Sequence, residues 1–150
     1  MSSSPAYTIY EDTNKAPAPG DSVECRIIGT IHTPYKSMDQ CPSRHDDNPY
    51  LPCTIKLAPD YAAGIKGLKE DGRALVLYWL HQARRDMVEL PAREGVRDKP
   101  VGVFSIRTPP RPNPIAASDV DILSVGEGEL EVTGLDCLDG TPLLDIKRSR

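Results

Sequence analysis

Two arginines and an asparagine lie close together in one proline-rich segment, Ser105–Ser118, which reads SIRTPPRPNPIAAS. Proline fixes its own φ and restricts the preceding residue, so Arg107, Arg111 and Asn113 are presented on a stiff backbone. Stiffness lowers the entropy cost of holding polar groups ready for a ligand, and the segment is therefore a candidate working surface. The alternatives are a rigid loop whose arginines face water and a proline-rich ligand of an SH3-type domain, and the flanking apolar strands disfavour the latter.

Polar residues also follow two other apolar stretches. His81 and Gln82 come directly after Arg73–Leu80, and Asp139-Gly140-Thr141-Pro142 follows a predicted hairpin. Glycine lets a backbone approach a ligand closely, while Asp139 and Thr141 offer an acceptor and a donor. A histidine after an apolar strand is more often structural than catalytic, and one tetrapeptide is a weak signal. Strand ends on one rim would nevertheless form a polar pocket.

The elements that must position these residues are mostly strands. Residues 1–22 lack hydrophobic periodicity and predict a flexible N-terminal arm, and residues 23–150 predict one domain. Asp60–Leu68 predicts one or two short helical turns. β-branched and apolar patterns predict strands at Val23–Ile31, Cys53–Leu57, Arg73–Leu80, Val101–Arg107, Asp119–Val125, Glu129–Leu135 and Leu143–Ile146, with the turn Gly126–Gly128 closing a hairpin.

The order of these elements indicates a mainly all-β fold, a β-barrel or closed sandwich. It shows no alternation of strands and helices, and it contains no G-x-G-x-x-G or P-loop pattern that would hold a nucleotide. The polar stretch Tyr35–Pro52 is too long for an idle connection, because long loops in compact domains are usually functional or disordered. We expect it to be functional.

Composition sets further limits. A chain of 150 residues suits one domain that buries roughly two thirds of its surface, so neither a disulfide nor a metal is required. Cys25 and Cys53 are expected in the core and Cys41 in an exposed loop. The net charge of −4 does not suggest nucleic-acid binding, although Arg84–Arg111 carries a small basic excess that fits a basic patch or a solvated loop equally well. No signal peptide or membrane span is evident, and we expect a cytoplasmic protein.

Several separated strings together resemble one family. They are Ile28–Lys36 (IGTIHTPYK), Gly67-Leu68, His81-Gln82, Gly102–Arg107 (GVFSIR), Arg111–Ile115 (RPNPI) with Ser118, Leu138–Pro142 (LDGTP) and Asp145–Lys147 (DIK). In this order they are similar to the TsaA-like, or TrmO, family. The resemblance implies a β-barrel that binds S-adenosylmethionine without a metal and forms homodimers with the cofactor near the subunit interface. Well-known members methylate N6 of N6-threonylcarbamoyladenosine beside the anticodon of transfer RNA.

The resemblance also assigns roles to residues. It implies that His81, Gln82, Arg107 and Asp139 through Pro142 line the cofactor pocket. Pro42-Ser43-Arg44 stands where the family has Pro-Arg-Gln and joins the same pocket. Arg111 and Asn113 become the catalytic, substrate-side residues, since a guanidinium can pair with phosphate or carboxylate.

Two departures from the family pattern matter, and the second, together with the net charge of −4, leaves the methyl acceptor open. Ala116 replaces the glycine that commonly follows RPNPI, and longer bacterial members continue beyond the position of Arg150 into a second domain implicated in holding transfer RNA. The leading hypothesis is a transfer-RNA methyltransferase. A methyltransferase acting on a small molecule and a non-catalytic S-adenosylmethionine-binding protein are the alternatives.

Overall fold

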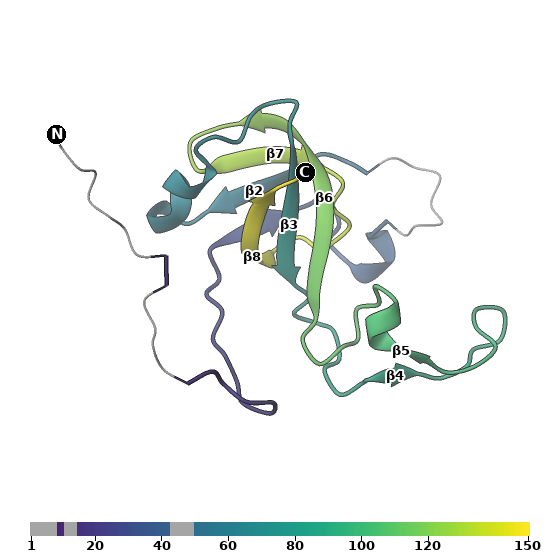
Figure 1. Cartoon of the computed structure of the whole chain (residues 1–150). Helices are drawn as coiled ribbons and strands as arrows, with labels where there is room; N and C mark the ends of the chain where they lie inside the picture. Colours follow the sequence, from purple (N-terminus) through teal and green to yellow (C-terminus); the bar gives the residue numbers. More distant parts are fainter. Residues whose placement is uncertain (1–8, 11–14, 43–49) are drawn as a thin grey trace.

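A closed barrel of six antiparallel strands forms the centre of the chain in the computed structural model, which describes residues 9–10, 15–42 and 50–150 (Figure 1). The expected β-barrel is thus confirmed. Around the barrel each strand pairs with the next, and the last pairs with the first. In that order the strands are β1 (Gly29–His32), β2 (Cys53–Leu57), β7 (Glu129–Thr133), β6 (Ile115–Val125), β3 (Arg73–Trp79) and β8 (Thr141–Arg148).

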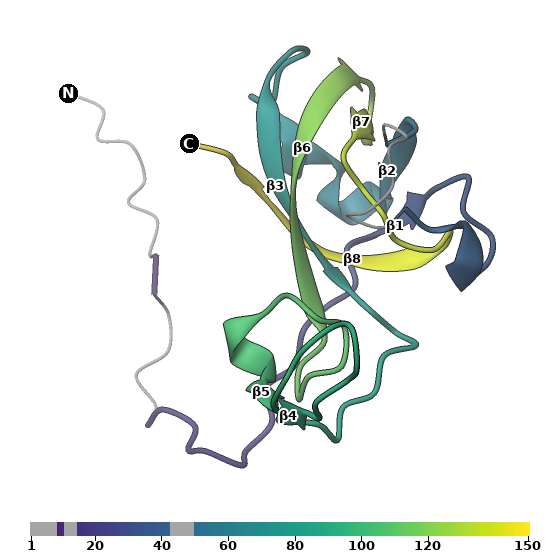
Figure 2. The same ribbon diagram turned by 90° about the vertical axis from the view of Figure 1, so that its right-hand side faces the viewer.

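A second, smaller unit stands away from the barrel between β3 and β6 (Figure 2). Its strands β4 (Glu89–Leu90) and β5 (Val101–Gly102) pair with each other, and the 3-10 helix η3 (Val103–Ser105) follows. We call residues 81–114 the excursion. Two further 3-10 helices, η1 (Met38–Gln40) and η2 (Pro59–Ile65), flank β2. No helix among the described residues is long and apolar enough to cross a membrane.

Alternating side chains fill the barrel. On β3 the inward residues Ala74, Val76 and Tyr78 are at most 1% exposed, whereas their neighbours are half-buried or exposed. The continuous apolar run Arg73–Leu80 predicted a strand buried on both faces, and that expectation was wrong because only one face meets the core. The core of the barrel comprises Ile31, Cys53, Ile55, Leu57, Ile65, Ala74, Val76, Tyr78, Val120, Ile122, Leu130, Val132, Leu135, Cys137 and Leu143.

The first predicted strand is shorter than expected. Val23–Ile31 was expected to pair throughout, but the paired register with β2 and β8 begins at Gly29, preceded only by Ile28, whose N–H donates to the Leu143 carbonyl at 3.0 Å. Val23 is 73% exposed and Cys25 is exposed, so the expectation of a core position for Cys25 was wrong, while that for Cys53 is confirmed. At Gly29 the two strands approach so closely that an added Cβ would collide with the carbonyl oxygen of Lys56.

The predicted strand Val101–Arg107 also ends early. Pairing stops at Gly102, where the chain turns into η3 and the Ser105 hydroxyl donates to the Gly102 carbonyl at 2.7 Å. The turn buries Val103 completely and leaves Phe104 76% exposed. The other predictions, namely the strand Cys53–Leu57, the hairpin closed by Gly126–Gly128, a last strand near Leu143–Ile146 and a short helix near Asp60, are confirmed with small shifts in extent.

Candidate functional site at one rim of the barrel

The strand register brings the candidate residues to one end of the barrel. Ile31 pairs with Thr141, Trp79 with Ile115, and Cys53 with Val132. Because neighbours are antiparallel, the chain leaves β1, β3 and β7 and enters β2, β6 and β8 at this same end. We call the segments 32–36, 80–82, 111–114 and 134–140 the polar rim. The expectation that the polar strand ends share one rim is confirmed for His81, Gln82 and Asp139, whereas Arg107 follows η3 and lies outside these segments.

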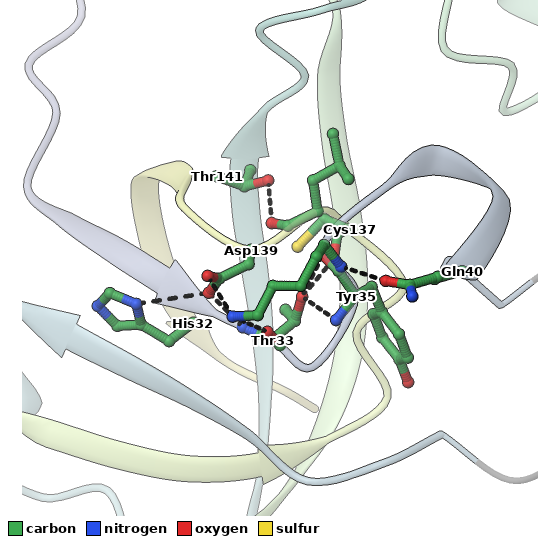
Figure 3. A network of polar contacts seen from close by, with 9 residues as sticks. His32, Thr33, Tyr35, Gln40, Cys137, Asp139 and Thr141 are labelled. Carbon is green, nitrogen blue, oxygen red and sulfur yellow. Dashed lines mark hydrogen bonds and ion pairs between the residues drawn. The ribbon is translucent and has the colours of Figure 1, made fainter.

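The Asp139 side chain contacts three residues of the segment 32–36 (Figure 3). Its Oδ2 lies 2.6 Å from the ammonium nitrogen of Lys36, and its Oδ1 accepts the backbone N–H of Thr33 at 3.0 Å. The imidazole Nδ1 of His32 lies 3.5 Å from the same Oδ1. Hydrogen bonding from Lys36, together with the Thr33 N–H and nearby positive charge, holds the pKa of the Asp139 carboxyl below its ordinary value of 3.8. Asp139 is therefore an ionised acceptor paired with the ammonium of Lys36.

Hydrogen bonds to main-chain carbonyls join the connection after β1 to the connection before β8. The Thr33 hydroxyl donates to the carbonyl of Cys137 at 2.8 Å, and the N–H of Asp139 donates to the Tyr35 carbonyl at 2.8 Å. The Thr141 hydroxyl donates to the Leu138 carbonyl at 2.7 Å, which closes the turn. Thr141, assigned to the cofactor pocket, is 1% exposed, so in this structure its side chain serves the turn.

Gly140 occupies the apex of that turn with a φ of +88°, a conformation that favours glycine. Its N–H donates to the Ile31 carbonyl at 2.8 Å. An added Cβ would meet no atom within 4 Å, so the space above the glycine is open. A ligand can approach the main chain here, next to the carboxylate of Asp139.

Arg111 is turned toward its own loop. Its Nη1 donates to the carbonyls of Ile106 and Thr108 at 3.1 and 2.9 Å, and its backbone N–H donates to the Arg84 carbonyl at 3.1 Å. One edge of the guanidinium thus holds the proline-rich segment in shape. Prolines were expected to stiffen this segment, and the two hydrogen bonds from Arg111 add to their effect. The other nitrogens of this guanidinium bond to no residue that the structure describes.

Arg85 fastens the same loop to the end of β3, a role that sequence reasoning missed. Its guanidinium carbon lies 5.1 Å from the centre of the Trp79 ring, within the range of a cation–π contact. Its Nε donates to the Pro112 carbonyl at 2.8 Å, and its Nη2 donates to Oδ1 of Asn113 at 3.2 Å. The chain has one tryptophan, and its proximity to an Arg-Arg pair was the available signal. We call this set the Arg85 clasp.

His81, Gln82 and Arg107 are exposed, and their side chains form no hydrogen bond or ion pair with any described residue. They are free to meet a ligand at or near the polar rim. Pro42 is half-buried just after η1, and Pro142 is half-buried at the start of β8. Ser43 and Arg44, the other two residues of the expected cofactor loop, lie outside the described residues.

A second polar cluster reaches from the barrel interior to the rim. The buried Tyr78 hydroxyl donates to Oδ1 of Asp136 at 3.0 Å and lies 2.7 Å from the Ser118 hydroxyl. Since the Tyr78 proton points to the carboxylate, Ser118 donates to Tyr78. Burial, and secondarily the charge of Asp136, raises the pKa of Tyr78. Sequence reasoning missed Tyr78 and Asp136, because only the register of β3 shows that a tyrosine at this position points inward.

Two clefts lie beside the barrel. One of about 320 Å³ lies between η2 and β8 and is lined by Asp60, Tyr61, Asp145, Ile28 and Ile146. Another of about 210 Å³ is lined by His32, at the edge of the polar rim, with Thr30 and Lys56. None of the candidate site residues lines either cleft. The types of side chain gathered at the rim therefore indicate a functional site there, whereas the positions of the clefts do not.

The domain is a closed six-stranded antiparallel β-barrel, with a charged rim and an arginine- and proline-rich loop held by the Arg85 clasp. Residues 30–148 match the model of the tRNA-methyltransferase O N-terminal domain, and the chain belongs to this family. It is 44% identical over 125 residues to "Probable S-adenosyl-L-methionine-binding protein VirR" of Rhizobium radiobacter, covering 83% of this chain and 69% of that one.

Two further comparisons agree. A "Probable S-adenosyl-L-methionine-binding protein" of Methanothermobacter thermautotrophicus is 38% identical over 125 residues, covering 83% of this chain and 88% of that one. The crystal structure of TrmO from Pseudomonas aeruginosa aligns with a TM-score of 0.69 at 30% identity, covering 87% of this chain. The chain spans 57% of that TrmO. The TrmO-like fold expected from the sequence is confirmed.

Proposed function

We propose that this protein binds S-adenosylmethionine at the polar rim and transfers its methyl group to N6 of N6-threonylcarbamoyladenosine beside the anticodon of transfer RNA. The observation that carries the proposal is the meeting of His81, Gln82, Asp139 and Gly140 at one end of a TrmO-family barrel. The family description and the names of the relatives support it. A transfer-RNA substrate is consistent with a cytoplasmic protein.

The chemistry of the rim fits the cofactor. Its amino-acid part needs partners for a carboxylate and an ammonium, and Lys36 and Asp139 offer a cation and an anion 2.6 Å apart. The ribose needs an acceptor, and the open space over Gly140 leaves room beside the Asp139 carboxylate. The exposed side chains of His81, Gln82 and Arg107 supply further donors.

The bound cofactor would supply an electrophilic methyl group, whose bond to sulfur breaks as the bond to N6 forms. Positioning then provides much of the acceleration, so the Arg85 clasp matters by fixing Pro112 and Asn113. Arg111 would orient the acceptor through its unbonded nitrogens, since a guanidinium does not accept a proton.

The N6 proton must also leave, and we propose Asp136 as its acceptor. The side chain is exposed at the rim, and the Tyr78 hydroxyl fixes its Oδ1 at 3.0 Å. A carboxylate there can take the proton and pass it to water. Tyr78 acts as a positioning residue, held in turn by Ser118.

The protein would act as a homodimer in which a second copy covers the cofactor. Ligand sites usually bury most of a small molecule, and the clefts beside the barrel, of about 320 and 210 Å³, are not lined by the residues assigned to the cofactor. The exposed apolar side chains Met38, Leu51 and Ile115 lie on segments next to the rim and are available for such a contact.

A second candidate function follows from the names of the relatives, which describe S-adenosyl-L-methionine-binding proteins. A protein of this kind would bind the cofactor without transferring its methyl group. Calorimetry with S-adenosylmethionine tests the claim common to both functions, which micromolar binding supports and the absence of binding contradicts. Radiolabelled cofactor with transfer RNA that carries the threonylcarbamoyl group but lacks the methyl group then separates them.

A further inference from the structure

The excursion carries charge opposite to that of the rest of the chain. Its 34 positions include seven Lys and Arg and four Asp and Glu, whereas the other residues include 11 Lys and Arg and 18 Asp and Glu. The overall charge of −4 therefore conceals one basic projection on an acidic barrel. In Figure 2 this projection extends from the end of β3 and the start of β6, which is the polar-rim end of the barrel.

Several of these cations are not used to hold the excursion together. Arg84 pairs with Asp86 at 2.7 Å, and Arg97 donates to the Pro91 carbonyl at 3.0 Å. The side chains of Arg93, Lys99 and Arg107 form no hydrogen bond or ion pair with any described residue. They are exposed and can pair with an external anion.

An aromatic side chain projects from the same unit. Phe104 is the only phenylalanine of the chain and is 76% exposed, while its neighbour Val103 is fully buried. The Ser105 hydroxyl fixes the turn, and the Val103 N–H donates to the Val88 carbonyl at 3.0 Å. Val88 is itself 65% exposed. The backbone of this turn thus exposes Phe104 on the same excursion that carries the free cations.

We infer that the excursion is the docking surface for the single-stranded loop of an RNA hairpin. An exposed aromatic ring on which a base can stack, carried on the same unit as cations that can meet phosphates, is the combination typical of single-strand binding. The inference rests on the proposed function and adds the surface through which the RNA would be held. It also explains how a chain of net negative charge can engage a polyanion.

The Arg85 clasp connects this surface to the chemistry. It fixes Pro112 and Asn113 against Trp79 at the end of β3, so the excursion is tied to the polar rim rather than hinged freely. A loop docked on Phe104 would have its neighbouring nucleotides directed toward the Arg111 side of the rim.

The test measures binding of a fluorescein-labelled RNA hairpin with a seven-nucleotide loop by anisotropy, using the full chain. Phe104→Ala is expected to raise Kd about tenfold, since base–aromatic stacking is worth roughly 1–3 kcal/mol per base, and Phe104→Tyr should restore it.

The double substitution Arg93→Ala and Lys99→Ala should raise Kd several-fold and flatten the dependence of log Kd on log salt. The matched control, Lys66→Ala with Lys69→Ala, removes the same charge from the exposed end of η2 and should leave Kd unchanged.

Four outcomes overturn the inference, the last of them together with the transfer-RNA function. In the first, the Phe104 and Arg93/Lys99 variants bind the hairpin as tightly as the wild type does and methylate transfer RNA at the wild-type rate. This result rejects the surface but keeps the proposed function. The second is an equal loss in the Lys66/Lys69 control, which would show that only total charge matters. The third is a change of oligomeric mass for Phe104→Ala in light scattering, which would assign Phe104 to a subunit contact. A wild-type protein that binds S-adenosylmethionine but neither binds nor methylates RNA rejects the inference and the transfer-RNA function together.

Discussion

Lys36 and Asp139 meet at 2.6 Å across the polar rim although 103 residues separate them in the chain. Asp139→Ala removes the ion pair and leaves the Thr33 N–H without its acceptor, so we expect a loss of about 1–2 kcal/mol in the free energy of unfolding. Asp139→Asn keeps an oxygen for Thr33 and loses only the ion pair, which at such exposure is worth roughly 0–1 kcal/mol. Urea unfolding measures both. Calorimetry should show that Asp139→Ala abolishes S-adenosylmethionine binding, and full retention of binding would remove Asp139 from the proposed pocket.

The same ion pair makes stability depend on pH in the acid range. The pKa of Asp139 is lowered by folding from its ordinary 3.8, so its contribution is fully present above that value and is lost as the pH falls through the lower folded value. The stability difference between wild type and Asp139→Asn should therefore be constant from pH 7 to pH 5 and shrink below pH 3.8. Urea midpoints at pH 7, 5 and 3 check this, and a difference that grows on acidification would contradict it.

Tyr78→Phe tests the cluster beneath the rim. The substitution keeps the buried ring and removes the hydroxyl that joins Ser118 to Asp136, so we expect a loss of about 1 kcal/mol in unfolding free energy. If Asp136 accepts the N6 proton, Asp136→Asn should lower the methyl-transfer rate without changing cofactor affinity, and Tyr78→Phe should displace the pH profile of the rate. Ser118→Ala provides the milder control. An unshifted profile in Tyr78→Phe would leave Tyr78 with a structural role only.

The Arg85 clasp can be followed through its own tryptophan. Arg85→Lys keeps the charge over Trp79 but loses the planar pair of donors to Pro112 and Asn113, so the loop should loosen. We expect easier acrylamide quenching of Trp79 fluorescence and roughly tenfold slower methyl transfer, because positioning supplies the acceleration. Arg84→Lys, which alters only an exposed pair with Asp86, is the control. Equal effects of the two substitutions would argue against the clasp.

The sequence predicted local structure well wherever the conformation of a segment depends on that segment alone. Cys53–Leu57 alternates over a length that suits one strand, and Gly126–Gly128 specifies a tight turn, so both were predicted nearly residue by residue. Val23–Ile31 has the same β-branched character, yet its pairing begins only at Gly29, which lies opposite the last residue of β2, and no local pattern contains that information. Phe104 was placed in a strand because its neighbours alternate, whereas a single Ser105 hydroxyl turns the chain.

The site follows the same division. Strand-end positions such as His81 and Asp139 could be assigned to one rim, because strand direction alone determines which ends meet. The contacts between residues at the rim could not be predicted from the sequence. Those of Lys36 with Asp139 and of Arg85 with Trp79 depend on the conformation of long side chains that reach across the rim. The division of Ser105–Ser118 into a cofactor half and a substrate half remains a prediction.

Incubation of the protein with methyl-labelled S-adenosylmethionine and transfer RNA bearing N6-threonylcarbamoyladenosine tests the central claim most directly. The account predicts label on that one nucleoside after digestion, with the signal lost in Asp139→Ala and strongly reduced in Asp136→Asn. Tight binding of S-adenosylmethionine with no label on the RNA would contradict it.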